Sequence, residues 1–189
     1  AVSLAACGST AASSAASAAD STASSAAEST AASDTAAADG QTYKVGICQL
    51  VQHVALDAAT QGFKDALTEQ LGDAVTFEEK NAQGDSNTCS TIINGFVSDN
   101  VDLILANATP ALQAAQAGTN TIPVLGTSVT EYGVALGIDD FNGLVGTNIS
   151  GTSDLAPLDE QAGIIKELFP DAKTVGLLYC SAEPNSQYQ

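Results

Sequence analysis

Residues 101–110 read Val-Asp-Leu-Ile-Leu-Ala-Asn-Ala-Thr-Pro, and this stretch decides the fold. Residues 101–106 are almost continuously apolar, as expected for a short parallel strand whose sheet is covered on both faces. Thr109 and Pro110 then open a helix, because Thr suits the N-cap and Pro suits the first turn, where a missing N–H costs nothing. A buried strand that leads directly into a helix predicts an α/β fold.

Strand and helix patterns alternate on both sides of this stretch. The strands are predicted at residues 43–50, 74–80, 101–106, 122–125, 144–149 and 174–179. Apolar residues at helical spacing occupy residues 56–71, 89–97 and 158–168, and Gly72 is the expected stop of the first of these helices. Alternation with short connections predicts a doubly wound parallel sheet with helices on both faces.

Residues 1–41 differ in composition from the rest of the chain. Leu4-Ala5-Ala6-Cys7 has the pattern of a lipobox, in which small residues precede the Cys that receives a lipid; a chance Ala-rich run that ends in a buried Cys remains the alternative. Residues 8–41 are almost entirely Ala, Ser and Thr, so they offer little to bury and are expected to form a flexible tether. Residues 42–189 are long enough for a domain with a real core.

Composition excludes several classes of function. The formal net charge is −17, with five Lys and no Arg, so nothing could neutralise the phosphates of a nucleic acid. The acidic pairs Glu78-Glu79 and Asp139-Asp140 lack metal-ligand spacing, and no nucleotide-binding or nucleophile motif is present. We therefore expect no enzyme activity, no metal and no cofactor.

Three cysteines follow Cys7. Cys48 falls in a strand pattern and Cys89 on the apolar face of a helix, so both are expected to be buried small hydrophobic residues. Cys180 follows the last predicted strand. A disulfide among them remains the less favoured alternative.

The candidate binding residues come from the turns that follow the strands, because ligands of such sheets bind beyond the carboxyl ends of the strands. These turns are rich in small hydroxyl and amide side chains. The candidates are Gln49, His53, Asn81, Thr109, Pro110, Ser128, Asp154, Glu183 and Asn185.

Roles can be assigned to some of these candidates. Free amides at the helix start after Thr109, together with Ser128, suit a carboxylate, whereas Asp154 or Glu183 could match an ammonium group. An amino-acid-like zwitterion is the expected ligand. For His53, a hydrogen bond at the start of its helix is the alternative to a role in binding.

The turns also carry a family resemblance. Their sequences are GICQLVQHVALD (46–57), NAQGD (81–85), ATPALQAAQA (108–117), GTSVTEYGVAL (126–136), GTSDLAP (151–157) and YCSAEPNS (179–186). In combination they resemble the ABC-transporter substrate-binding proteins whose relatives bind tryptophan and other aromatic amino acids. The resemblance implies a type I periplasmic-binding-protein fold, in which two α/β lobes close over a ligand.

This resemblance implies a domain organisation and a function. Residues 1–7 would end a lipoprotein signal, 8–41 form the tether, 42–150 the first lobe and 151–189 the hinge and an incomplete second lobe, as in a fragment truncated at both ends. The protein would capture a small polar solute, an amino acid, for the ABC permease in the membrane. It would lie outside the cytoplasmic membrane, lipid-anchored through Cys7, in a Gram-positive organism. The alternatives are a lipoprotein sensor that signals to a membrane receptor and an exported enzyme.

Overall fold

The computed structural model describes residues 40–188, except the side chain of Gln187. The lipobox at Cys7 and nearly all of the expected tether lie outside the described residues. The described chain contains a five-stranded sheet in the order β2-β1-β3-β4-β5, and every neighbouring pair is parallel. The strands are β1 (Tyr43–Gln49), β2 (Val75–Asn81), β3 (Leu103–Asn107), β4 (Val124–Val129) and β5 (Ile149–Ser153).

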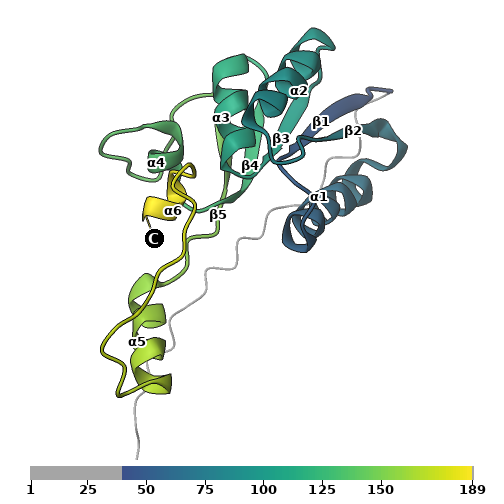
Figure 1. Ribbon diagram of the computed structural model, residues 1–189. Helices are drawn as coiled ribbons and strands as arrows, with labels where there is room; N and C mark the ends of the chain where they lie inside the picture. Colours follow the sequence, from purple (N-terminus) through teal and green to yellow (C-terminus); the bar gives the residue numbers. More distant parts are fainter. Residues whose placement is uncertain (1–39, 189) are drawn as a thin grey trace, which may run out of the picture. The chain divides into compact units, whose positions relative to one another are not determined.

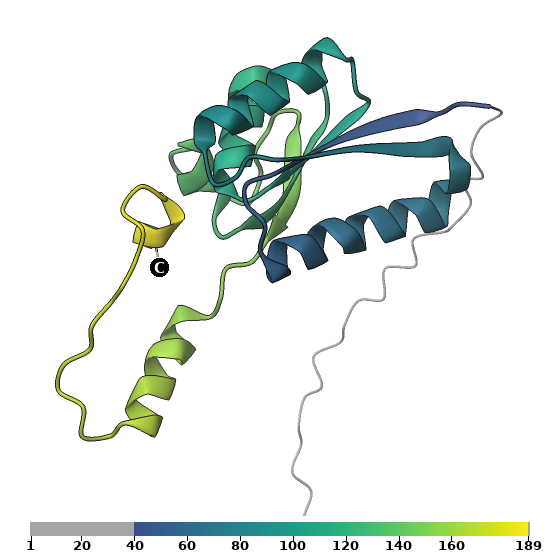
Figure 2. The same ribbon diagram turned by 45° about the vertical axis from the view of Figure 1, so that its right-hand side comes forward.

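Helices connect these strands and cover both faces of the sheet. The helices are α1 (Val54–Leu71), the 3₁₀ turn η1 (Gly72–Ala74), α2 (Ser86–Ser98), α3 (Thr109–Gly118), α4 (Tyr132–Leu136), α5 (Leu158–Leu168) and α6 (Asn185–Tyr188). Figures 1 and 2 show α1 on one face of the sheet and α2 with α3 on the other. The predicted doubly wound α/β architecture is therefore confirmed.

Two apolar clusters form the core, one on each face of the sheet. Val45 and Ile47 of β1 pack on the α1 side with Phe63, and Cys48 packs on the opposite side with α2 and α3. Gly46 also points to the α2 side, where an added Cβ would collide with the ring of Phe96. Because side chains alternate between the faces of a strand, a strand covered on both faces is apolar throughout.

The ends of the first helices follow from local chemistry. His53 caps α1 with its Nδ1, which accepts a hydrogen bond from the Ala55 N–H at 3.2 Å. Gly72 ends that helix at a positive φ of 56°, which glycine adopts without a steric penalty. The stop at Gly72 matches the prediction, and the bond of His53 matches the alternative given for that residue. Asp85 caps α2 in the same way through the Thr88 N–H, at 2.6 Å.

Several predicted boundaries are wrong. β4 continues to Val129 and so includes the residues assigned to a turn. Residues 144–148 form no strand, because Gly143 and Gly146 take positive φ values of 91° and 73° and bend the chain; the strand begins at Ile149 instead. Smaller shifts place the start of β2 at Val75 and that of β3 at Leu103.

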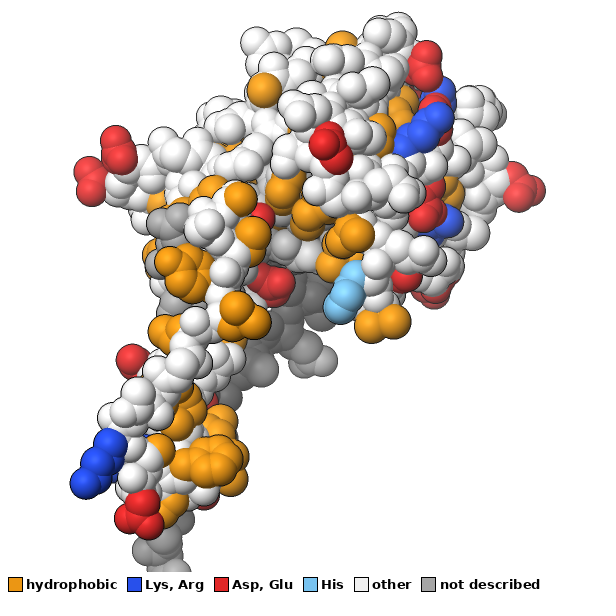
Figure 3. All heavy atoms as spheres, in the orientation of Figure 1, with side chains coloured by type: hydrophobic (Ala, Val, Ile, Leu, Met, Phe, Trp, Pro, Cys, Tyr) orange, Lys and Arg blue, Asp and Glu red, His pale blue; other side chains and the backbone are white. Residues whose placement is uncertain are grey.

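The strand predicted at residues 174–179 is absent from the described structure. A strand requires a hydrogen-bonded neighbour, and no described segment pairs with these residues. Their apolar side chains are exposed, Leu178 completely so. The apolar side of α5 is also exposed at Ile164 and Leu168, and Figure 3 shows apolar side chains gathered on this part of the surface.

Candidate functional site

The carboxyl ends of the parallel strands lie along one edge of the sheet, which we call the rim. Gln49 at the end of β1 is in register with Asn81 of β2 and with Asn107 of β3. Asn107 is in turn in register with Thr127 of β4. The polar turns that follow these strands therefore begin side by side, as the sequence predicts.

One cavity at the rim, the α3 pocket, gathers several of the candidate residues. Its volume is about 210 Å³. It is lined by Ala108, Thr109, Ser128, Thr130, Glu183, Asn185 and Ser186. Thr109, Ser128, Glu183 and Asn185 were all candidates from the sequence, although they come from three separate parts of the chain.

The backbone around this pocket has an unusual conformation. Ala108 takes a φ of 87° and is the N-cap of α3, so the assignment of Thr109 to that position is wrong. The side chain of Ala108 cannot cap the helix, so the free N–H groups of its first turn lack that partner. Ser128 also has a positive φ, 56°, beside an irregularity in the pairing of β4 with β5. Such conformations cost free energy and concentrate at binding sites.

Asn185 supplies the buried polar group of the α3 pocket. It is 3% exposed, and its Nδ2 donates a hydrogen bond to Thr109 Oγ1 at 3.1 Å. Its Oδ1 is buried and has no partner within the described residues. Glu183 lies beside it, and its carboxylate accepts the backbone N–H of Asn185 at 3.2 Å. The pocket therefore combines helix N–H donors with carbonyl and carboxylate acceptors.

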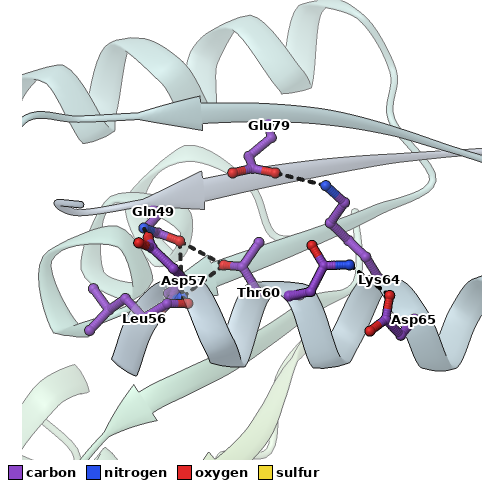
Figure 4. Close-up of polar contacts among 9 residues, drawn as sticks. Gln49, Leu56, Asp57, Thr60, Lys64, Asp65 and Glu79 are labelled. Atoms are coloured by element: carbon purple, nitrogen blue, oxygen red, sulfur yellow. Dashed lines mark hydrogen bonds and ion pairs between the residues drawn. The ribbon is translucent and has the colours of Figure 1, made fainter. Parts of the chain in front are cut away.

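A second cavity, the β1 pocket, lies at the ends of β1 and β2. It has a volume of about 380 Å³ and is lined by Gln49, Val51, Gln52, Asp57, Glu79, Asn81 and Gln83. Gln49 is 3% exposed, and its Nε2 donates to Asp57 Oδ1 at 2.6 Å while its Oε1 accepts from the Thr60 hydroxyl at 2.7 Å (Figure 4). Asn81 Oδ1 accepts the Gln83 N–H at 2.8 Å. Gln49 and Asn81, the two candidates in this pocket, thus also form hydrogen bonds within its wall.

Asn107 is a rim residue that we did not single out from the sequence. It is fully buried, and its Nδ2 donates to Leu56 O and to Thr60 Oγ1, both at 2.9 Å. It thereby ties the end of β3 to α1 at the point where the winding of the sheet reverses, between β1 and β3. The sequence did contain a signal for this role, because Asn107 is the polar last residue of a strand that is otherwise apolar.

Three candidates line neither pocket. His53 caps α1 at an exposed position, and Pro110 occupies the first turn of α3. Asp154 is exposed, and its N–H donates to Val129 O at 3.1 Å.

Tyr132 is 6% exposed and packs into the core. Its hydroxyl donates to Thr152 O at 3.2 Å. Burial, with a contribution from the charge of Asp154, raises the pKa of Tyr132 to about 12. Tyr132 also borders a cavity of about 470 Å³ beside β5 that contains none of the candidates.

Some of the remaining charged groups form ion pairs on the surface. Glu78 contacts Lys44 at 2.8 Å and Lys80 at 3.3 Å, and these hydrogen bonds hold the pKa of Glu78 below its usual value. Glu79 pairs with Lys64 at 3.0 Å. Among residues 40–188, no cluster of His, Cys, Asp or Glu is arranged to hold a metal ion. The described helices include none with the length and apolar character needed to cross a membrane.

A parallel α/β sheet with a polar rim is an architecture that can bind a small solute beyond its strand ends, and comparison with known proteins identifies the family. The family model of the ABC transporter substrate binding proteins matches residues 44–189, and this chain belongs to that family. Proteins of this family act outside the cytoplasm.

Individual relatives are similar over the same region. A tyrosine-binding protein of Clostridioides difficile is 41% identical over 148 residues, which are 77% of this chain and 43% of that protein. The complex of a Streptococcus pneumonia ABC domain with L-Trp has a TM-score of 0.73 at 33% identity and covers 78% of this chain and 50% of the other. A conserved domain protein from Vibrio cholerae has a TM-score of 0.73 at 36% identity, and the match covers 78% of this chain and 51% of the other. This chain therefore spans about half the length of the relatives it matches.

Proposed function

We propose that the protein containing this chain captures an amino acid with an aromatic side chain and delivers it to an ABC permease. The family supports a role in solute binding. The relatives described as binding tyrosine and L-Trp support the class of ligand. The single observation that carries the proposal is the α3 pocket, where the start of α3 has no side-chain cap from Ala108 and Asn185 contributes a buried Oδ1 that has no partner within the described residues.

The α3 pocket would hold the amino acid's charged head group. The first-turn N–H groups of α3, with Thr109 and Ser128, would bind the carboxylate, because a helix N-terminus attracts negative charge. Glu183 and the Asn185 Oδ1 would accept hydrogen bonds from the ammonium group. A volume of about 210 Å³ leaves the aromatic ring to be bound outside this pocket.

The other candidates would contribute around the ligand. Gln49, His53 and Asn81 would border the first part of the rim, Pro110 would set the start of α3, and Asp154 would add a negative charge beyond β5. Micromolar affinity corresponds to only about −8 kcal/mol, which several charge-assisted hydrogen bonds and an apolar wall can supply. Binding alone would be required of these residues, without bond chemistry.

The organisation of the whole protein is part of the proposal. Residues 42–150 would form the first lobe, and residues 151–189 would contain the hinge and the beginning of a second lobe. Ligand would bridge the lobes and favour the closed form that the permease binds. Cys7 would carry the lipid anchor, and residues 8–41 would hold the lobes away from the membrane surface.

Analogue binding to the intact protein tests the proposal. Calorimetry should detect binding of L-tyrosine or L-tryptophan, and saturation should occur without consumption of the ligand. Tyramine and tryptamine lack the carboxylate and should bind at least about tenfold more weakly, a loss of about 1.4 kcal/mol. Equal affinity for the amino acid and its decarboxylated analogue would contradict the head-group assignment. Absence of binding to any amino acid would contradict the proposed ligand class.

A further inference from the structure

The thiols of Cys48 and Cys89 are not used by either rim pocket. Cys48 lies in β1 and Cys89 in the second turn of α2, and neither side chain is exposed. Both belong to the apolar cluster between the sheet and its α2–α3 layer. The described chain holds them as free cysteines. They are thus a buried pair in one apolar cluster, on two elements that pack together where the ring of Phe96 in α2 lies against Gly46 of β1.

A hydrogen-bonding interaction with the Cys89 thiol, followed by burial, raises the pKa of the Cys48 thiol. A disulfide between them would require the specific side-chain angles that bonded cysteines adopt. The third described thiol, Cys180, is exposed and belongs to a different part of the chain.

Both cysteines are close to the rim. Cys48 directly precedes Gln49, whose backbone O accepts the Ala82 N–H at 2.9 Å, and Cys89 lies one helical turn after the cap residue Asp85. A covalent link between them would join the end of β1 to the helix that follows the NAQGD turn. Proteins of this family act outside the cytoplasm, where structural disulfides persist.

We propose that Cys48 and Cys89 form a disulfide that fastens β1 to α2 beneath the rim. The oxidant is a low-molecular-weight disulfide. One protein thiolate attacks it and releases one small thiol, and the second protein thiol then displaces the other small thiol from the mixed disulfide. The protein loses two S–H hydrogens and gains one S–S bond, and the oxidant is reduced to two thiols. Because both side chains are buried, this exchange takes place during folding or opening of the core.

The test uses the full chain with Cys7→Ser and Cys180→Ser, which leaves only the two buried thiols. The protein is refolded from urea at low concentration with oxidised glutathione, then denatured, alkylated with N-ethylmaleimide and weighed by mass spectrometry. A matched sample is refolded under reducing conditions. A third protein carries Cys48→Ala in addition, so that Cys89 has no partner.

The expected result is a monomer that takes up no alkylating group and weighs about 2 Da less than the fully reduced chain. Digestion should yield one linked pair of peptides containing Cys48 and Cys89, and oxidation should move urea unfolding to higher concentration, reversibly with reductant. The Cys48→Ala chain should not form this product. Two alkylated thiols after oxidative refolding, two glutathione adducts, or links only between molecules would overturn the proposal. Because ligand is not involved, this outcome is independent of the proposed function.

Discussion

Single residues in this fold have effects that depend on what surrounds them, and the glycines provide a clear case. Gly126 of β4 and Gly151 of β5 are in register, and the hydroxyl end of Tyr132 lies over the pair. A Cβ at Gly151 would collide with the Tyr132 hydroxyl and with the backbone of Gly126. Gly95 in α2 has no atom within 4 Å of the place a Cβ would take.

We expect Gly151→Ala and Gly95→Ala to have opposite effects. Gly151→Ala should lower the free energy of unfolding by about 1–3 kcal/mol, because the added methyl group overpacks the β4–β5 contact. Gly95→Ala should leave it unchanged or raise it by up to about 1 kcal/mol, since Ala favours the helix. Urea denaturation of both variants measures the difference. A neutral Gly151→Ala would mean that Tyr132 does not lie against this strand pair.

The carboxylate of Asp85 gives stability that depends on pH. Hydrogen bonds from the backbone N–H and then the side chain of Thr88 hold the pKa of Asp85 below its usual value. The cap therefore stabilises the fold fully above the unfolded-state pKa, about 3.9, and this contribution disappears as pH falls through the lower folded-state pKa. Asp85→Ala should lower the melting temperature near pH 7, with a difference from wild type that shrinks below about pH 4.

Asp85→Asn is the matched control for this pH effect. It keeps an oxygen that can accept from the Thr88 N–H but cannot titrate, so its melting temperature near pH 7 should lie between those of wild type and Asp85→Ala. A gap between wild type and Asp85→Ala that stayed constant from pH 7 to pH 3 would contradict the role of the charged cap.

At the scale of elements, one polar network joins three pieces of secondary structure. Asn107 of β3, Gln49 of β1 and Thr60 of α1 share hydrogen bonds beneath the rim. A buried network of this kind fixes how the helix sits on the strand ends, because an unpaired member costs free energy.

Asn107→Ala should lower the free energy of unfolding by about 1–3 kcal/mol, since it removes the donor that Thr60 and Leu56 O use. Asn94→Ala is the matched control on the exposed surface of α2, where a change within about 0.5 kcal/mol is expected. Chemical denaturation compares them. Equal effects at the two positions would show that the network does not stabilise the lobe.

At the scale of the whole molecule, the α3 pocket is assembled from distant parts of the sequence. Thr109 begins α3, Ser128 lies in β4, and Asn185 begins α6. The hydrogen bond from Asn185 to Thr109 joins residues that are 76 positions apart. Binding at this pocket should therefore depend on the hydroxyl of Thr109.

Thr109→Val keeps the shape of the side chain and removes its hydroxyl. If the α3 pocket holds the ligand's head group, this change in the intact protein should weaken amino-acid binding by about tenfold, or about 1.4 kcal/mol. Thr91→Val makes the same change at an exposed position of α2 and should leave affinity unchanged. Calorimetry measures both. Unchanged affinity in Thr109→Val would remove this hydroxyl from the site.

The sequence by itself determined the α/β class and the approximate positions along the chain of the first four strands and the helices between them, because apolar periodicity and local caps such as Gly72 act over short distances. It also placed the polar turns at one rim, since parallel strands share their direction. Tertiary structure alone decided that β5 begins at Ile149, that residues 174–179 have no strand partner, and that Ala108 rather than Thr109 caps α3. It also decided the network around Asn107 and the contact of Asn185 with Thr109. Strand pairing and pocket formation depend on residues far apart in the chain, and local sequence preferences do not contain that information.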